Sequence, residues 1–161
     1  MNVLIACEES QRICKAFRAR GHNAFSCDIL ECSGGHPEWH IQCDVLTILN
    51  PFDKPTGRKE IWFCTQDGFN HSVSKWDLII AHPPCTFLTL AGNKWFKPEY
   101  KERFPNRARQ REDAVSFFMQ FANADCDRIA IENPVCIMSS RWRKPDQYIE
   151  PYFFGEPEKK K

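Results

Sequence analysis

The chain has 161 residues and a mass of 18.9 kDa, which is enough for a single domain with a buried core. Its 22 lysines and arginines nearly balance 21 aspartates and glutamates. This balance excludes a uniformly basic nucleic-acid coat and an acidic tail, but not a local basic patch. No apolar stretch approaches the roughly 18 residues that cross a bilayer, and no secretion signal opens the chain. We therefore expect a soluble, cytoplasmic protein with no membrane partner.

Nine cysteines are many for this length. Their number is odd, and Cys7, Cys27 and Cys64 lie in apolar, strand-like runs. In a reducing compartment this pattern predicts that most of them are reduced and buried as small hydrophobic side chains, and it argues against a disulfide framework.

The first elements along the chain are a strand, a helix and two strands. Residues 2–7 form a short apolar run, typical of a strand buried on both faces. Ser10 is the expected N-cap of a helix that ends before Gly21. Residues 24–28 predict a second strand and residues 41–46 a weaker third.

The second half continues the alternation. Residues 76–81 predict a strand ended by two prolines, 106–123 a helix with a wide apolar stripe, and 128–131 a further strand. Two long loops, 47–75 and 86–105, complete the chain. Strands that alternate with helices predict an α/β fold with a mostly parallel sheet and helices on both faces.

Polar side chains stand where the predicted strands end. Parallel sheets bind ligands beyond the carboxyl ends of their strands, so these side chains predict the position of a site. They are Glu8, Asp28, Asp44, Cys85 and Glu132.

Two short motifs carry the chemistry. Cys85 follows Pro83-Pro84 in a stiff turn that could present a thiolate, or the turn could merely contain a cysteine. Glu132-Asn133-Pro134 places a carboxylate at the end of a buried strand, where salt bridging or capping is the alternative role.

With both motifs present, one helix apart, the chain resembles the DNA cytosine-5 methyltransferases, and in more detail their short phage and prophage relatives. Asp28, the Cys43-Asp44 pair and residues 144–155 support the resemblance, which covers essentially the whole chain. It implies a Rossmann-like class I methyltransferase fold in one domain over 1–161, with no separate DNA-recognition domain. Because the chain stops at Glu158-Lys-Lys-Lys161, we expect C-terminal strands to be missing.

The resemblance implies roles for individual residues. Cys85 would add as a thiolate to C6 of cytosine in DNA, and Glu132 would bind N3 and the exocyclic amine. The activated C5 would take a methyl group from S-adenosylmethionine. Pro84, Thr86, Asn133 and Pro134 would line the base site, and a target in duplex DNA would have to be flipped out of the stack.

For the cofactor, the resemblance implies Asp28 and the neighbouring Ile29 at the ribose, Asp44 at the adenine amine, and Pro83. The loop after the first strand contains no glycine. Glu8 or the adjacent Glu9 could bind the ammonium group and backbone amides near Ser10 the carboxylate. Equally, these side chains could close the pocket.

Basic residues are concentrated between residues 94 and 111. This stretch contains seven lysines and arginines, only two acidic residues, and interleaved aromatic residues. This composition is typical of single-strand binding, although a solvated helix start is the alternative. Nucleic-acid contacts are therefore expected from Arg107, Arg109, Arg111 and Arg141.

Other interpretations remain open at this point. A zinc site could be drawn from Cys27, Cys32, His36, His40 and Cys43, but no paired Cys-x-x-Cys exists, and we expect no metal. His82 could act as a base or cap its turn. The rival function is a degenerate, non-catalytic relative that binds nucleic acid, a nucleotide or a host protein. An enzyme acting on free pyrimidine nucleotides is a third option, and a homodimer could complete the sheet.

Overall fold

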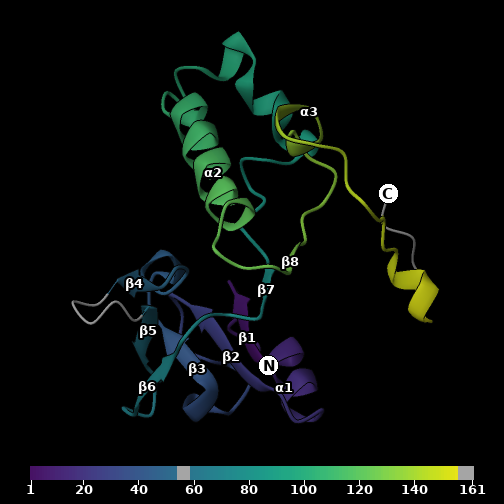
Figure 1. Cartoon of the computed structure of the whole chain (residues 1–161). Helices are drawn as coiled ribbons and strands as arrows, with labels where there is room; N and C mark the ends of the chain where they lie inside the picture. Colours follow the sequence, from purple (N-terminus) through teal and green to yellow (C-terminus); the bar gives the residue numbers. More distant parts are fainter. Residues whose placement is uncertain (54–58, 156–161) are drawn as a thin grey trace.

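The computed structural model of the chain (Figure 1) describes residues 1–53 and 59–155. It is an α/β fold in which a five-stranded parallel sheet stands beside a three-stranded antiparallel sheet. The expected parallel sheet is confirmed. The expectation that C-terminal strands are missing is not tested by the described residues.

The parallel sheet has the strand order β3-β2-β1-β7-β8, and all four neighbouring pairs run parallel. The first strand of the chain therefore lies at the centre. The five strands are β1 (Asn2–Ala6), β2 (Asn23–Asp28), β3 (His40–Gln42), β7 (Leu78–Ala81) and β8 (Ile129–Ile131).

The side chains of β1 alternate between two hydrophobic clusters, as a strand buried on both faces requires. Val3 and Ile5 pack on one face with Cys14 of α1 (Arg12–Arg18), whereas Leu4 and Ala6 belong to the larger cluster on the opposite face. The apolar run at residues 2–7 thus encodes contacts to both layers.

The antiparallel sheet corrects the expected loop over residues 47–75. It consists of β4 (Phe52–Asp53), β5 (Lys59–Cys64) and β6 (Asn70–Val73), and it supplies Ile61, Phe63 and Val73 to the larger cluster. Phe121 of α2 (Arg107–Ala122) enters the same cluster. Helices therefore contact both faces as expected, but the second face is shared between a helix and a sheet.

Several element boundaries also differ from expectation. The third strand ends at Gln42 rather than 46, because the Asp44 side chain accepts a hydrogen bond from Leu46 N and starts a 3-10 turn over Val45–Thr47. The strand expected at 76–81 begins at Leu78. The N-cap of α1 is Gln11, not Ser10.

The segments that follow β7 and β8 gather around α2, beyond the end of the parallel sheet (Figure 1). Buried Leu88, Phe118, Cys136 and Met138 form their hydrophobic cluster. The remaining helices are 3-10 helices at Pro37–Trp39, Leu90–Phe96, Pro98–Tyr100 and Pro151–Phe154, and the short α3 at Met138–Arg141.

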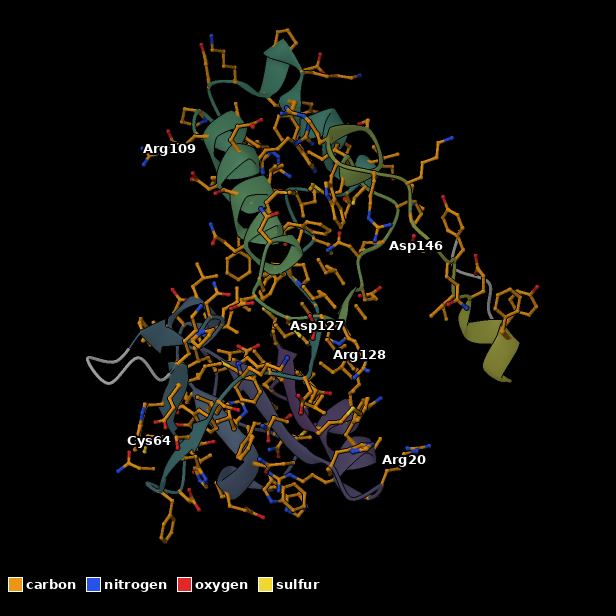
Figure 2. All side chains as sticks on the ribbon, in the orientation of Figure 1. Arg20, Cys64, Arg109, Asp127, Arg128 and Asp146 are labelled. Atoms are coloured by element: carbon orange, nitrogen blue, oxygen red, sulfur yellow. The ribbon has the colours of Figure 1, made fainter. Side chains whose placement is uncertain are left out.

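All nine cysteines are free thiols, but only Cys14, Cys27 and Cys136 are buried, so the expectation that most are buried is wrong. Cys64 is exposed on β5 (Figure 2). Within the described ranges, no helix has the length and apolar composition needed to span a bilayer.

Candidate functional site

The two motif turns lie side by side at the carboxyl edge of the parallel sheet. Ala81 pairs with Ile131 in the register of β7 and β8, so His82 and Glu132 follow at equivalent positions. Asn133 Nδ2 donates a hydrogen bond to Pro83 O at 2.9 Å and ties the second turn to the first. The expected assembly of the Pro-Pro-Cys and Glu-Asn-Pro turns is therefore present in the fold.

The chain segments that follow the turns hold them in place. Ile137 N donates to Leu88 O at 3.0 Å, and Thr89 forms an antiparallel bridge with Cys136. This contact has no counterpart in the sequence patterns, because it joins two stretches without strand periodicity.

Cys85 starts a tight turn, since its carbonyl accepts hydrogen bonds from Leu88 N and Thr89 N. Its side chain is half-buried. Pro83 is buried, whereas Pro84 and Thr86 are exposed. The thiol thus sits on a rigid turn that solvent reaches.

His82 faces the glutamate of the second motif. Its Nδ1 lies 3.6 Å from Glu132 Oε2, and 64% of the Glu132 side chain is exposed. His82 Nε2 and Asn133 Oδ1 are buried and have no hydrogen-bond partner among the described residues. The two turns therefore each bury one polar atom, the His82 ring nitrogen and the Asn133 amide oxygen, that forms no hydrogen bond with the described residues.

A pocket of about 320 Å³ opens between α2 and the turn that follows Pro83. This volume is at the small end of the roughly 300–1,000 Å³ of ligand pockets. The turn and α2 line it with Pro84, Thr86, Phe87, Gln110, Asp113, Ala114 and Phe117.

A second group of side chains gathers at the ends of β1, β2 and β3. Burial, and then the negative charges of Asp28 and Asp44, raise the pKa of the Cys7 thiol to about 12. Each carboxylate also accepts a backbone N–H two residues on, from Leu30 and Leu46 respectively. The acids expected at the ribose and adenine therefore do lie at one edge, next to an exposed Ile29 (73%).

Glu8 is engaged by the protein itself. Its buried carboxylate accepts hydrogen bonds from Ile13 N at 2.7 Å and Cys14 N at 3.2 Å, the amides of the first turn of α1. These are the groups that would otherwise attract an anion at a helix start. Glu8 thus takes the capping role expected of Ser10.

The loop after β2 covers the β1–α1 turn. Ser33 N donates to Glu9 O, and the buried Gln11 side chain forms two hydrogen bonds with the His36 backbone. A Cβ on Gly34 would lie 2.5 Å from Gln11 Cβ and 2.6 Å from Ser10 O. The loop therefore packs directly against the β1–α1 turn at Gly34, while Asp28 and Asp44 stand at the neighbouring acidic edge.

The expected nucleic-acid arginines have structural partners. Arg111 lies 3.4 Å from the Phe96 ring centroid and donates to Phe87 O, and Arg107 stacks near the same phenylalanines. Arg141 forms a two-pronged ion pair with Glu112. Arg109 points away from α2 into solvent, 3.9 Å from Asp113 (Figure 2).

The zinc alternative is not supported. His40 is buried between Ser26 Oγ and Leu30 O, and His36 stacks on Trp39. No cluster of three metal-ligating side chains occurs in residues 1–53 and 59–155.

Comparison with known proteins identifies no relative: no family model, curated protein or solved structure matches the chain.

Proposed function

We propose that the protein transfers a methyl group to C5 of cytosine in DNA, with Cys85 as the nucleophile and Glu132 as the base-binding carboxylate. The observation that carries this proposal is the Asn133–Pro83 hydrogen bond. It joins the two turns whose motifs resemble those of the cytosine-5 methyltransferases. A thiol and a carboxylate are thereby offered to one substrate.

Cytosine C5 is a weak nucleophile, and addition of a thiolate at C6 makes it enamine-like. The turn that presents the Cys85 sulfur is closed by the hydrogen bonds from Leu88 N and Thr89 N to the Cys85 carbonyl. Glu132 stabilises the charge that develops at N3 and the exocyclic amine during addition. Elimination of the thiolate and loss of the C5 proton restore the ring. Pro84 and Thr86, the sequence neighbours of Cys85, line the 320 Å³ pocket, where the flat base would lie.

His82 is a positioning residue in this proposal. Its Nδ1 lies close to Glu132 Oε2, so the imidazole orients a carboxylate that is otherwise exposed. Asn133 fixes the same turn from the other side through Pro83.

S-adenosylmethionine supplies the methyl group when bound. Asp28 would hold its ribose and Asp44 its adenine amine, since both carboxylates stand at the same sheet edge. Glu8 and Ser10 are not assigned to it, because Glu8 caps α1 and the Ser10 carbonyl lies against Gly34.

A second candidate is the non-catalytic relative that binds a nucleotide or nucleic acid. The contact of Gly34 with the β1–α1 turn favours it, because that contact occupies the place where a methionine end would lie. Under this alternative Asp28 and Asp44 still bind a nucleoside, but no methyl donor is held.

The two candidates are separated by an assay that needs no methyl donor. Reversible addition of Cys85 to C6 lets C5 exchange its hydrogen with solvent. We expect mass spectrometry to detect deuterium uptake at C5 of a cytosine oligonucleotide incubated with the protein in D₂O. Calorimetric titration with S-adenosylmethionine, with and without the oligonucleotide, then measures the cofactor site separately.

Matched variants make the assay specific. Cys85→Ala should abolish exchange, and Cys126→Ala, which removes another half-buried thiol, should leave it unchanged. Absence of exchange by the unaltered protein would reject the thiolate mechanism. Exchange without cofactor binding would keep the chemistry of Cys85 and reject S-adenosylmethionine as its methyl donor.

A further inference from the structure

Two cysteine sulfurs meet at the ends of neighbouring strands. Cys27 lies near the end of β2 and Cys43 just beyond β3, and their Sγ atoms are 3.9 Å apart. The backbone fixes this approach, because Cys43 N donates to Asp28 O at 3.1 Å. The pair lies at the acidic edge but touches neither motif turn of the proposed function.

The two thiols differ in accessibility and acidity. Cys27 is fully buried, whereas Cys43 is half-buried and within 3.6 Å of Thr47 Oγ1. The hydrogen bond from Cys27 lowers the pKa of Cys43 to about 6, despite burial and the nearby Asp44. The same hydrogen bond, together with burial, raises the pKa of Cys27. Cys43 is therefore the more acidic and the more accessible thiol of the pair, and Cys27 is its buried partner.

We propose that Cys43 and Cys27 form a thiol–disulfide exchange site that reacts with low-molecular-weight disulfides. Cys43 attacks first and Cys27 resolves. The proposal does not depend on methyl transfer, because Cys85 and Glu132 take no part in it.

The exchange balances in two steps. The Cys43 thiolate attacks one sulfur of the small disulfide, a new S–S bond forms, the old one breaks, and one thiolate leaves. Cys27 then loses its proton to that leaving thiolate, which becomes a thiol, and the Cys27 thiolate attacks Cys43 Sγ and releases the second small molecule as a thiolate. The two cysteines lose two electrons, and the small disulfide gains them.

The local structure permits the bond. A disulfide needs an S–S distance of about 2.05 Å, so the sulfurs must approach by about 2 Å. Cys43 lies between the three-residue strand β3 and a 3-10 turn, at the edge of the sheet. The backbone at Cys43 can therefore shift without disturbing the strands at the sheet centre. Once Cys43 is in the mixed disulfide, it no longer accepts the proton of Cys27, which removes one cause of the raised pKa.

The test is equilibration of the folded protein in buffers of oxidised and reduced glutathione, followed by acid quenching and disulfide mapping. We expect the Cys27–Cys43 bond to form first and to be reversed by excess reduced glutathione. Cys27→Ala should instead accumulate the glutathione adduct of Cys43, and Cys43→Ser should leave Cys27 unmodified because it is buried. Cys64→Ser, which removes an exposed thiol on β5, is the matched control and should not change the result.

Two results would overturn the proposal. One is a stable glutathione adduct on Cys43 of the unaltered protein with no internal bond. The other is a Cys43 that stays reduced while Cys64 is modified.

Discussion

At the residue scale, position alone gives chemically identical thiols opposite behaviour. Cys7 follows β1 with a positive φ of 60°. Its thiol is partly buried and lies near the carboxylates of Asp28 and Asp44. Cys43 receives a hydrogen bond from a neighbouring thiol. The pKa of Cys7 is raised to about 12 and that of Cys43 is lowered to about 6.

This difference predicts the pH dependence of alkylation. Only the thiolate reacts, so the rate for a thiol rises with pH up to its pKa and is then constant. Peptide-level mass spectrometry after short iodoacetamide pulses should show Cys43 near its maximum rate by about pH 7, and Cys7 still rising at pH 10. In urea both rates should follow ordinary thiols, and a Cys43 profile that stays ordinary in the folded protein would contradict the assignment.

Glu8 offers a second prediction at this scale. Its buried carboxylate satisfies two orphan amides of α1, so Glu8→Ala should lower the free energy of unfolding by about 2 kcal/mol in urea titrations. Glu9→Ala is the neighbouring control and should cost less, because the contact assigned to Glu9 is made by its backbone carbonyl. Equal losses would show that capping is not the role of Glu8.

At the element scale, the segment before α2 is held by arginine side chains. Arg107 lies over Phe87, Phe96 and Phe104, and Arg111 also lies over the Phe96 ring. Desolvation by burial lowers the pKa of Arg111, which agrees with a guanidinium packed among aromatic rings. Arg107 and Arg111 of the basic cluster therefore stabilise the 86–105 segment, whether or not the cluster also binds nucleic acid.

Substitution of these arginines should have unequal effects. Arg111→Ala removes a stacked cation and a hydrogen bond to Phe87 O, so we expect a loss of about 1–2 kcal/mol and faster proteolysis between residues 90 and 105. Arg109→Ala should change stability by less than about 0.5 kcal/mol, because its side chain is 86% exposed. If single-stranded DNA binds, Arg109→Ala should still weaken it at low salt. A stability loss as large as that of Arg111→Ala would contradict this division.

Local sequence patterns predict the elements whose signals are local. The apolar runs of β1, β2 and β7 and the stripe of α2 follow from periodicity, and the two motif turns follow from prolines that end strands. The antiparallel sheet escaped prediction because β4 has two residues and β6 four, too few for a period-2 pattern to stand out.

Long-range contacts were not predictable in this way. Gly34 approaches Gln11 across 23 positions, and Cys27 meets Cys43 across 16. A glycine pair in a loop is compatible with many turns, and a cysteine near a strand end gives no sign of its partner. The capping role of Glu8 was missed for the same reason, since the amides that donate to its carboxylate lie five and six residues ahead on a helix whose start was placed at Ser10.

At the scale of the whole molecule, α2 connects two hydrophobic clusters. Phe121 is fully buried in the cluster of the parallel sheet, and Phe118, one turn earlier, is buried in the cluster with Leu88 and Met138. Ile131 of β8 contacts both clusters. The candidate active-site turns start in the first cluster and end in the second, so their geometry depends on the two staying joined.

The two phenylalanines should therefore report on different parts of the molecule. Each Phe→Ala change removes a buried ring and should cost about 3–5 kcal/mol where the ring packs. In hydrogen exchange, we expect Phe118→Ala to raise exchange mainly over residues 86–142, while β1 and β2 keep their protection. Phe121→Ala should lower protection in β1, β2 and β5 as well, because its ring packs on that core. If Phe118→Ala instead lowered protection equally in β1, the two clusters would unfold as one cooperative unit, and the turns at Cys85 and Glu132 could not move independently of the sheet.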